Sequence, residues 1–76
     1  MKYFELRPND GHKSFYGKAI VKNGTLFSYG TPIMSINGVT VRHWDDWTKT
    51  TGRHIQAFSG LNKKDFYRLQ YEQFNP

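Results

Sequence analysis

The chain contains no cysteine, few acidic residues and no long apolar run. Without cysteine, no disulfide and no thiolate site can stabilise the small core. No apolar stretch approaches the roughly 20 residues needed to span a bilayer. The first residues also carry charges where a signal peptide requires an apolar run. We therefore expect a cytoplasmic protein.

The shortage of acidic residues leaves the chain basic. Six Asp and Glu stand against eleven Lys and Arg, which gives a formal net charge of +5. The excess lies in residues 1–44, which hold six Lys or Arg and two acids, while residues 45–76 hold five and four. A basic balance favours an anionic partner, either nucleic acid or an acidic protein surface. It is also common in small proteins that have no such partner.

Aromatic side chains are abundant, with six Phe, five Tyr and two Trp among 76 residues. A chain of this length buries only about 60% of its unfolded surface. Each aromatic ring can bury roughly 150–250 Å², which suits a thin core. We expect one domain spanning residues 1–76, with some of the rings serving as surface anchors.

Strand-like alternation dominates the first half of the chain. Residues 2–7 alternate weakly, whereas residues 14–22 place small and apolar side chains on one face. Asn23-Gly24 and Asn37-Gly38 are typical of type I′ hairpin turns, in which both central residues take positive φ. Two such turns separated by a strand predict an antiparallel meander.

The segment between these turns, residues 25–36, is interrupted at Gly30-Thr31-Pro32. Proline cannot donate a ladder hydrogen bond, so Pro32 indicates a bulge, a bend or an edge position. We interpret residues 25–36 as one long bent strand or two short ones. A further strand is expected over residues 39–44.

Helical patterns fill the second half of the chain. Thr48 is the predicted N-cap of a first helix, and apolar residues then recur at helical spacing up to a stop at Ser59-Gly60. Asn62 is the predicted N-cap of a second helix, with Asp65 three residues later as in a capping box. This C-terminal helix is expected over residues 62–74.

The sequence therefore predicts an α+β fold. An antiparallel meander of three to four strands is followed by two helices, and the first helix packs on one sheet face. The expected core consists of Phe15, Ala19, Val21, Phe27, Ile36, Val39, Val41, Ile55, Phe58 and Leu69.

Three short motifs occur in order within residues 14–58: Ser14-Phe15-Tyr16-Gly17-Lys18-Ala19, then Ser28-Tyr29-Gly30-Thr31, then Thr50-Thr51-Gly52-Arg53-His54-Ile55-Gln56-Ala57-Phe58. Together they resemble the pattern S-F-Y-G-K-A, S-Y-x-T, T-T-x-(R/K)-H-(I/L)-x-x-F of small uncharacterised proteins from phages and other mobile elements of Gram-positive bacteria. The resemblance implies a sheet-plus-helix core over residues 14–58 and such an origin, but no activity. Gly52 departs from a good helical sequence, at a cost of about 1 kcal/mol relative to alanine. The C-terminal helix lies outside the pattern.

Catalytic and metal-binding patterns are weak. His43, Asp45 and Asp46 lie close in sequence but have no known ligand spacing, so we expect no metal and no cofactor. Thr50-Thr51 with Arg53-His54 would suit an anion at a helix N-terminus, but no nucleophile–base pair is visible. We expect structural roles for these residues and no enzymatic activity. Loss of hydrolysis in a His54→Ala variant would indicate the opposite.

Cations and rings alternate along the predicted strands. Tyr16, Lys18 and Lys22 share one strand face, and Arg42 and Trp44 share an outward face of another. If the two faces align, bases can stack on the rings while the cations follow the phosphates of single-stranded nucleic acid. The alternative is an ordinary solvated face on which lysine discourages edge aggregation.

The second predicted helix carries a similar group of cations and rings. Tyrosine and arginine are preferred at protein interfaces, so this helix either contacts a partner, including a second copy of the chain, or only completes the core. Its candidate binding residues are Lys63, Lys64, Tyr67, Arg68 and Tyr71.

These patterns favour a small non-enzymatic binding protein of a phage or mobile element. We expect it to engage a host protein, and inhibition of a defence nuclease in the manner of anti-CRISPR proteins is the most specific form of this hypothesis. The alternative is a nucleic-acid-binding module that uses the basic, aromatic strand face.

Overall fold

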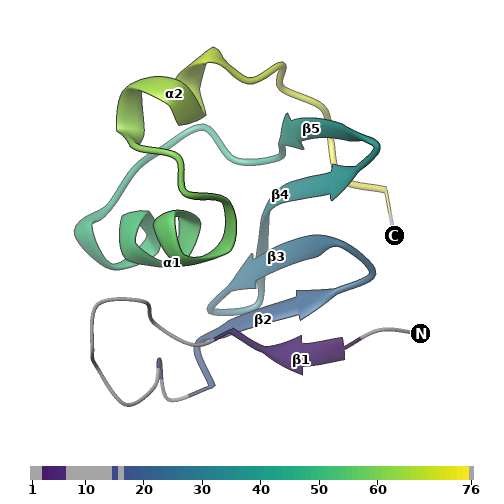
Figure 1. Cartoon of the computed structure of the whole chain (residues 1–76), viewed down its shortest axis with the longest axis vertical. Coiled ribbons are helices and arrows are strands. Elements are labelled where there is room, and N and C mark those ends of the chain that lie inside the picture. Colours follow the sequence, from purple (N-terminus) through teal and green to yellow (C-terminus); the bar gives the residue numbers. More distant parts are fainter. Residues whose placement is uncertain (1–2, 7–14, 16, 76) are drawn as a thin grey trace.

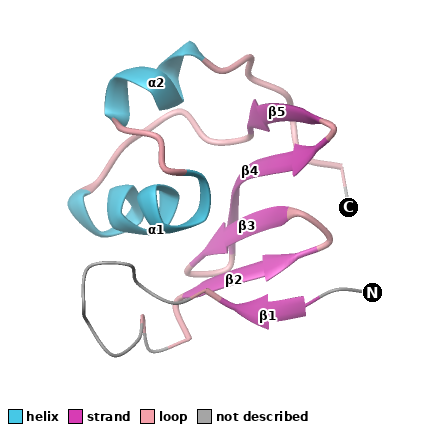
Figure 2. Cartoon of the chain, viewed as in Figure 1, coloured by secondary structure: helices cyan, strands magenta, loops and turns pink. Residues whose placement is uncertain are grey.

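The computed structural model describes residues 3–6, 15 and 17–75, and it has an antiparallel sheet with two helices (Figures 1 and 2). Each strand pairs with its sequence neighbours, in the order β1-β2-β3-β4-β5. The sheet therefore has five strands where three to four were expected. The elements are β1 (Tyr3–Glu5), β2 (Ala19–Lys22), β3 (Thr25–Ser28), β4 (Thr31–Asn37), β5 (Val39–Arg42), α1 (Lys49–Ser59) and α2 (Lys63–Arg68).

Residues 25–36 form two strands, which was one of the two expected alternatives, and the division comes from a hairpin turn that the sequence did not reveal. Tyr29 and Gly30 have φ values of 52° and 81°, and Ser28 pairs with Thr31. Positive φ at both central positions is the type I′ geometry, so this turn divides residues 25–36 into β3 and β4. Tyrosine rarely adopts positive φ, which is why the pattern did not predict the turn.

The two Asn-Gly turns differ from each other. Asn23 and Gly24 have φ values of 52° and 78°, so the predicted type I′ turn between β2 and β3 is confirmed. At the second turn only Gly38 has positive φ, and Asn37 pairs with Val39. The type I′ prediction for Asn37-Gly38 is therefore wrong. A two-residue turn would instead pair Ile36 with Val39, one position out of the observed register.

The pairing of β3 with β4 is irregular near Pro32, as the sequence predicted. The β3–β4 register shifts between Leu26, which pairs with Met34, and Phe27, which pairs with Pro32. Ile33 is the extra residue, and it is buried together with Met34. A bulge in this position lets two consecutive side chains of β4 enter the interior.

Both predicted helix starts are confirmed. The Thr48 hydroxyl accepts a hydrogen bond from the Thr51 amide at 3.1 Å, and the Asn62 side chain accepts one from the Asp65 amide at 2.8 Å. Gly60 closes α1 in the left-handed conformation, with φ 78°.

The second helix is much shorter than predicted, because α2 ends at Arg68 rather than near residue 74. The following segment lies along the edge of β5. The Arg42 amide donates to Gln70 O at 3.0 Å, and the Glu72 amide donates to Arg42 O at 2.9 Å. This pairing satisfies backbone groups of the open β5 edge that a longer helix would leave without partners.

The strand register defines two sheet faces. Val21, Leu26 and Met34 lie on the first face, which we call the helix face because Ser28 on the same face reaches Thr51 of α1. Thr25, Ser35 and Val41 lie on the second face. Phe74 covers part of that face, with its ring 5.5 Å from the ring of Phe27 and 5.3 Å from that of His43. We call this second side the tail face.

The core forms mainly between the helix face and the two helices. Of the predicted core, Phe15, Ala19, Val21, Val41 and Ile55 are buried. The prediction that Ile36 and Val39 belong to the core is wrong, since their side chains are 42% and 70% exposed beside the β4–β5 turn. Phe27, Phe58 and Leu69 are only partly buried. The buried apolar residues that the prediction omitted are Leu6, Leu26, Ile33, Met34 and Phe66.

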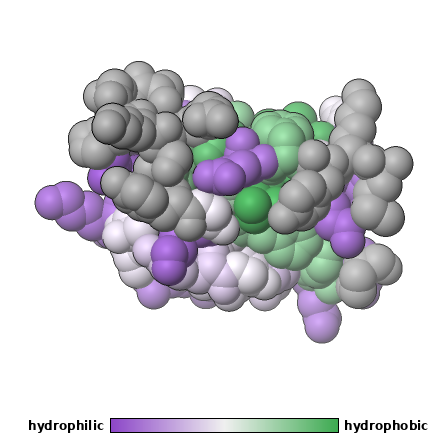
Figure 3. Space-filling view, turned by 90° about the horizontal axis from the view of Figure 1, so that it is seen from below, coloured by the Kyte–Doolittle hydropathy of each residue, from purple (hydrophilic) through white to green (hydrophobic). Residues whose placement is uncertain are grey.

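The sheet ends at β1, which has only three residues. The surface seen from this side combines apolar and hydrophilic side chains (Figure 3), and the Phe4 side chain is 51% exposed. A strand this short presents few unpaired backbone groups to another chain.

Candidate functional site

The predicted basic strand face does not assemble. Lys22 pairs with Thr25 on the tail face, whereas Arg42 pairs with Met34 on the helix face. Lys18 precedes β2, and its Nζ lies 5.3 Å from the centroid of the Tyr29 ring. Trp44 packs against the core instead of pointing outward. Tyr16 lies outside the described residues.

Arg42 is held in place by the protein's own carbonyl and carboxylate groups. Its Nε donates to Leu69 O at 3.1 Å, and its Nη1 donates to Trp44 O at 3.2 Å and to the Asp45 carboxylate at 3.0 Å. Its side chain is 14% exposed, while that of Asp45 is 77% exposed. The two carbonyl bonds therefore hold the guanidinium more strongly than the solvated ion pair does.

Two tyrosines flank this fixed guanidinium. The Arg42 Cζ lies 5.7 Å from the ring centroid of Tyr67 and 5.4 Å from that of Tyr71, within cation–π range. Tyr67 and Tyr71 are 37% and 50% exposed. The structure thus brings together Arg42 from β5, Tyr67 from α2 and Tyr71 from the following segment, and we call this group the arginine–tyrosine cluster.

Three further cations lie on α2, the helix that carries Tyr67. Lys63, Lys64 and Arg68 are exposed on the six residues of α2. Asp65 on the same helix is partly buried, and its amide is bonded to Asn62. Near the two rings, these three cations stand beside two exposed acids: Asp45, which is paired with Arg42, and Glu72, which follows Tyr71.

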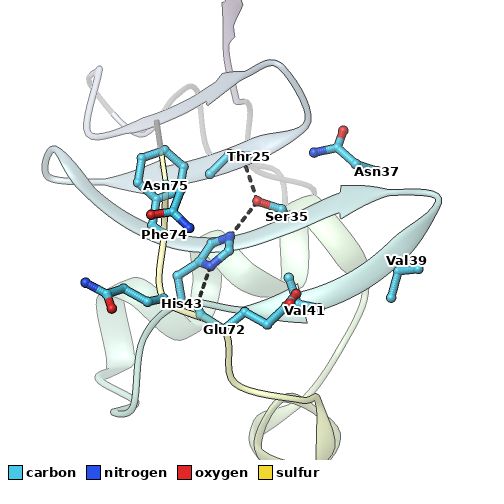
Figure 4. A pocket seen from close by; sticks show the side chains of 10 residues that line it. Thr25, Ser35, Asn37, Val39, Val41, His43, Glu72, Phe74 and Asn75 are labelled. Atoms are coloured by element: carbon cyan, nitrogen blue, oxygen red, sulfur yellow. Dashed lines mark hydrogen bonds between the residues drawn. The ribbon is translucent and has the colours of Figure 1, made fainter.

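A second site lies on the tail face, around His43 (Figure 4). The His43 Nε2 lies 2.6 Å from Ser35 Oγ, and its Nδ1 lies 2.7 Å from Glu72 O. The Ser35 hydroxyl lies 2.6 Å from Thr25 Oγ1. These side chains line a pocket of about 320 Å³.

The contacts of His43 determine the direction of its hydrogen bonds. A backbone carbonyl only accepts, so Nδ1 carries the proton that is donated to Glu72 O. In the neutral ring, Nε2 then accepts from the Ser35 hydroxyl. Ser35 Oγ in turn accepts from Thr25. The result is a directed chain of hydrogen bonds that runs from Thr25 through Ser35 and His43 to the backbone carbonyl of Glu72.

His54 lies in the interior. It is 1% exposed, its Nδ1 is 2.8 Å from Ser28 Oγ, and the Phe15 ring lies edge-on at 4.5 Å. Burial, with a smaller contribution from the Arg53 charge, lowers the pKa of His54 below its ordinary value. The Ser28 hydroxyl also contacts Thr51 at 3.1 Å. These contacts link α1 to β3 and leave no opening for a substrate.

Within the part of the chain that the structure describes, no three His, Asp or Glu side chains converge as metal ligands. Asp45 is engaged with Arg42, and Asp46 accepts from the Trp47 amide at 2.7 Å. Neither α1 nor α2 has the length and apolar character needed to cross a bilayer.

The pairing of Ser35 with His43 was not predicted. Ser35 is opposite Val41 in the observed register, so His43, two residues further along, is its diagonal neighbour on the same face. The expected two-residue turn would have placed Ser35 and His43 on opposite faces. Only the correct β4–β5 register would have revealed the pair.

Comparison with known proteins gives a family but no activity. The model of a family of unknown function (DUF8033) matches residues 4–74. No curated protein matches the chain, and no solved structure matches it. The match extends beyond the motifs of residues 14–58 in both directions, and it includes α2 and the segment after it.

Proposed function

The chain belongs to the family DUF8033, and we propose that it is a small binding protein. It engages an acidic protein surface through its arginine–tyrosine cluster. Arg42, fixed between the half-exposed rings of Tyr67 and Tyr71, carries this proposal. Rings that are already held in place lose little conformational freedom on binding.

The residue types of this surface agree with those found at protein interfaces. Tyrosine and arginine are enriched among residues that dominate binding energy. Lys63, Lys64 and Arg68 add exposed positive charge on the helix that carries Tyr67, and such charge accelerates encounter with an acidic partner. We further propose that the partner is a host protein in the cytoplasm and that this chain derives from a phage or mobile element. A defence nuclease inhibited as by anti-CRISPR proteins is the most specific such partner.

The binding proposal is tested by affinity capture from a cell extract at moderate salt, with the Tyr67→Ala/Tyr71→Ala variant beside the unmodified chain. Tyr29→Ala is the matched control, because Tyr29 is also exposed (58%) and also lies beside a cation, Lys18. We expect one acidic protein to be captured by the unmodified chain and by Tyr29→Ala but not by the double variant.

Two results would contradict the proposal. Capture that is equal for all three proteins would exclude the arginine–tyrosine cluster as the binding surface. Capture that disappears after nuclease treatment, with an affinity that falls steeply as salt rises, would show nucleic acid to be the partner instead.

A further inference from the structure

The described residues contain two serine–histidine pairs with different surroundings. Ser28 and His54, 2.8 Å apart, are 2% and 1% exposed and lie between β3 and α1. Ser35, which is 7% exposed, and the partly buried His43 are 2.6 Å apart, and both line the pocket of about 320 Å³ on the tail face. Only the second pair combines a serine hydroxyl, a histidine base and space for a small molecule.

The second pair has the arrangement of an activated nucleophile. A base within hydrogen-bond reach of a hydroxyl, itself oriented by a third group, is the geometry that prepares serine for attack. Glu72 O orients His43 at 2.7 Å and holds the proton on Nδ1, so that Nε2 accepts the serine proton. The Thr25 hydroxyl, 2.6 Å from Ser35 Oγ, donates to that oxygen and fixes the orientation of the serine hydroxyl.

We propose that Ser35 is an acylation site that, with His43 as general base, hydrolyses small uncharged esters. Ser35 Oγ attacks the ester carbonyl carbon while its proton passes to His43 Nε2. The tetrahedral adduct then collapses, His43 returns the proton to the leaving alcohol, and an ester of Ser35 remains. Water attacks that ester while one of its protons passes to His43 Nε2, and His43 then returns this proton to Ser35 Oγ as the acid leaves, which restores the serine.

The pocket lining indicates the substrate class. Val39, Val41 and Phe74 provide apolar walls, and the carboxamides of Gln73 and Asn75 are neutral hydrogen-bond donors. Among the residues that the structure describes, the lining contains no lysine or arginine, and Glu72 is its one acidic residue. This environment favours a short, uncharged acyl group over an anionic ester. The pocket and the arginine–tyrosine cluster share no residue, so the variants at Tyr67 and Tyr71 test the binding proposal separately from this one.

The experiment incubates the full chain with p-nitrophenyl acetate and follows p-nitrophenol release together with the position of the acetyl group by peptide mass spectrometry. We expect an acetyl group on Ser35 and its absence in Ser35→Ala. His43→Gln should slow acylation by about 100-fold, the lower end of a typical general-base contribution. Ser28→Ala is the matched control and should be acylated at the unmodified rate.

Locating the acetyl group in the unmodified chain does not depend on whether any variant folds. Acetyl groups found only on lysines or the N-terminus would overturn the proposal. So would an acylation rate that is unchanged in folded Ser35→Ala, with folding confirmed by circular dichroism.

Discussion

The indole of Trp47 lies directly over Gly52, so that a Cβ atom on residue 52 would come within 2.6 Å of Cε2 and Cζ2 of the ring. Gly52 is buried within α1, and the Trp47 ring also lies 5.8 Å from that of Phe66 in the core. The glycine that weakens the helix in sequence terms therefore lets the chain before α1 pack against the helix.

The first prediction is that Gly52→Ala destabilises the fold by up to about 2 kcal/mol. Alanine favours the helix by about 1 kcal/mol, but displacing the indole from a packed position costs typically 1–3 kcal/mol and also disturbs Phe66. Urea unfolding measures the difference. In a Trp47→Ala background the same substitution should become stabilising, because the clash is absent. A stabilising effect in the presence of Trp47 would show that the ring yields without cost.

The second prediction concerns the two carbonyl groups that Arg42 satisfies. Arg42→Lys should lower the free energy of unfolding by about 1–3 kcal/mol, because one ammonium group cannot reproduce the separate bonds from Nε and Nη1 to Leu69 O and Trp44 O. Asp45→Asn should change it by less than about 0.5 kcal/mol, because that carboxylate is mostly exposed. Equal effects of the two substitutions in thermal unfolding would contradict this ranking.

The third prediction is a loss of stability at mildly acidic pH caused by His54. Its pKa is lowered in the folded state by burial and, to a smaller extent, by Arg53, so the unfolded chain binds the proton more readily. The contribution is complete above the ordinary histidine pKa of about 6.5 and falls as the pH drops towards the folded value, by up to about 1.4 kcal/mol per pH unit. Denaturant unfolding between pH 7.5 and 5 measures it. His54→Gln should show a smaller pH dependence, and an identical dependence would assign the effect to other groups.

The fourth prediction concerns the strained turn at Tyr29. Tyr29→Asn should raise the free energy of unfolding by about 0.5–1 kcal/mol, because asparagine adopts the observed φ of 52° more readily than tyrosine does. The ring is 58% exposed, so little packing is lost. A lower midpoint in urea would show that the contacts of the ring with Lys18 and His54 outweigh the backbone strain.

Local rules correctly predicted the features that depend on a few neighbouring residues. Thr48 and Asn62 cap their helices, Gly60 ends α1 and Asn23-Gly24 turns between strands, because each needs only its own side chain and the adjacent backbone. The α+β class follows from the same patterns. The Tyr29-Gly30 turn escaped prediction because tertiary contacts of β3 and β4 impose a conformation that tyrosine disfavours.

The candidate sites required contacts between segments distant in sequence. Arg42 meets Tyr67 and Tyr71 only because α2 ends at Arg68 and the following segment pairs with β5. Ser35 meets His43 only because Asn37 pairs with Val39, and a shift of one residue would separate them.

Sequence patterns were sufficient for the Asn23-Gly24 turn, the starts of both helices and the presence of a sheet before them, because these properties arise from side chains acting on the nearest backbone. The tertiary structure alone decided the strand register, the length of α2 and the partners of Arg42 and His43. The reason is that each of these depends on which distant group satisfies a backbone hydrogen bond at the edge or face of the sheet.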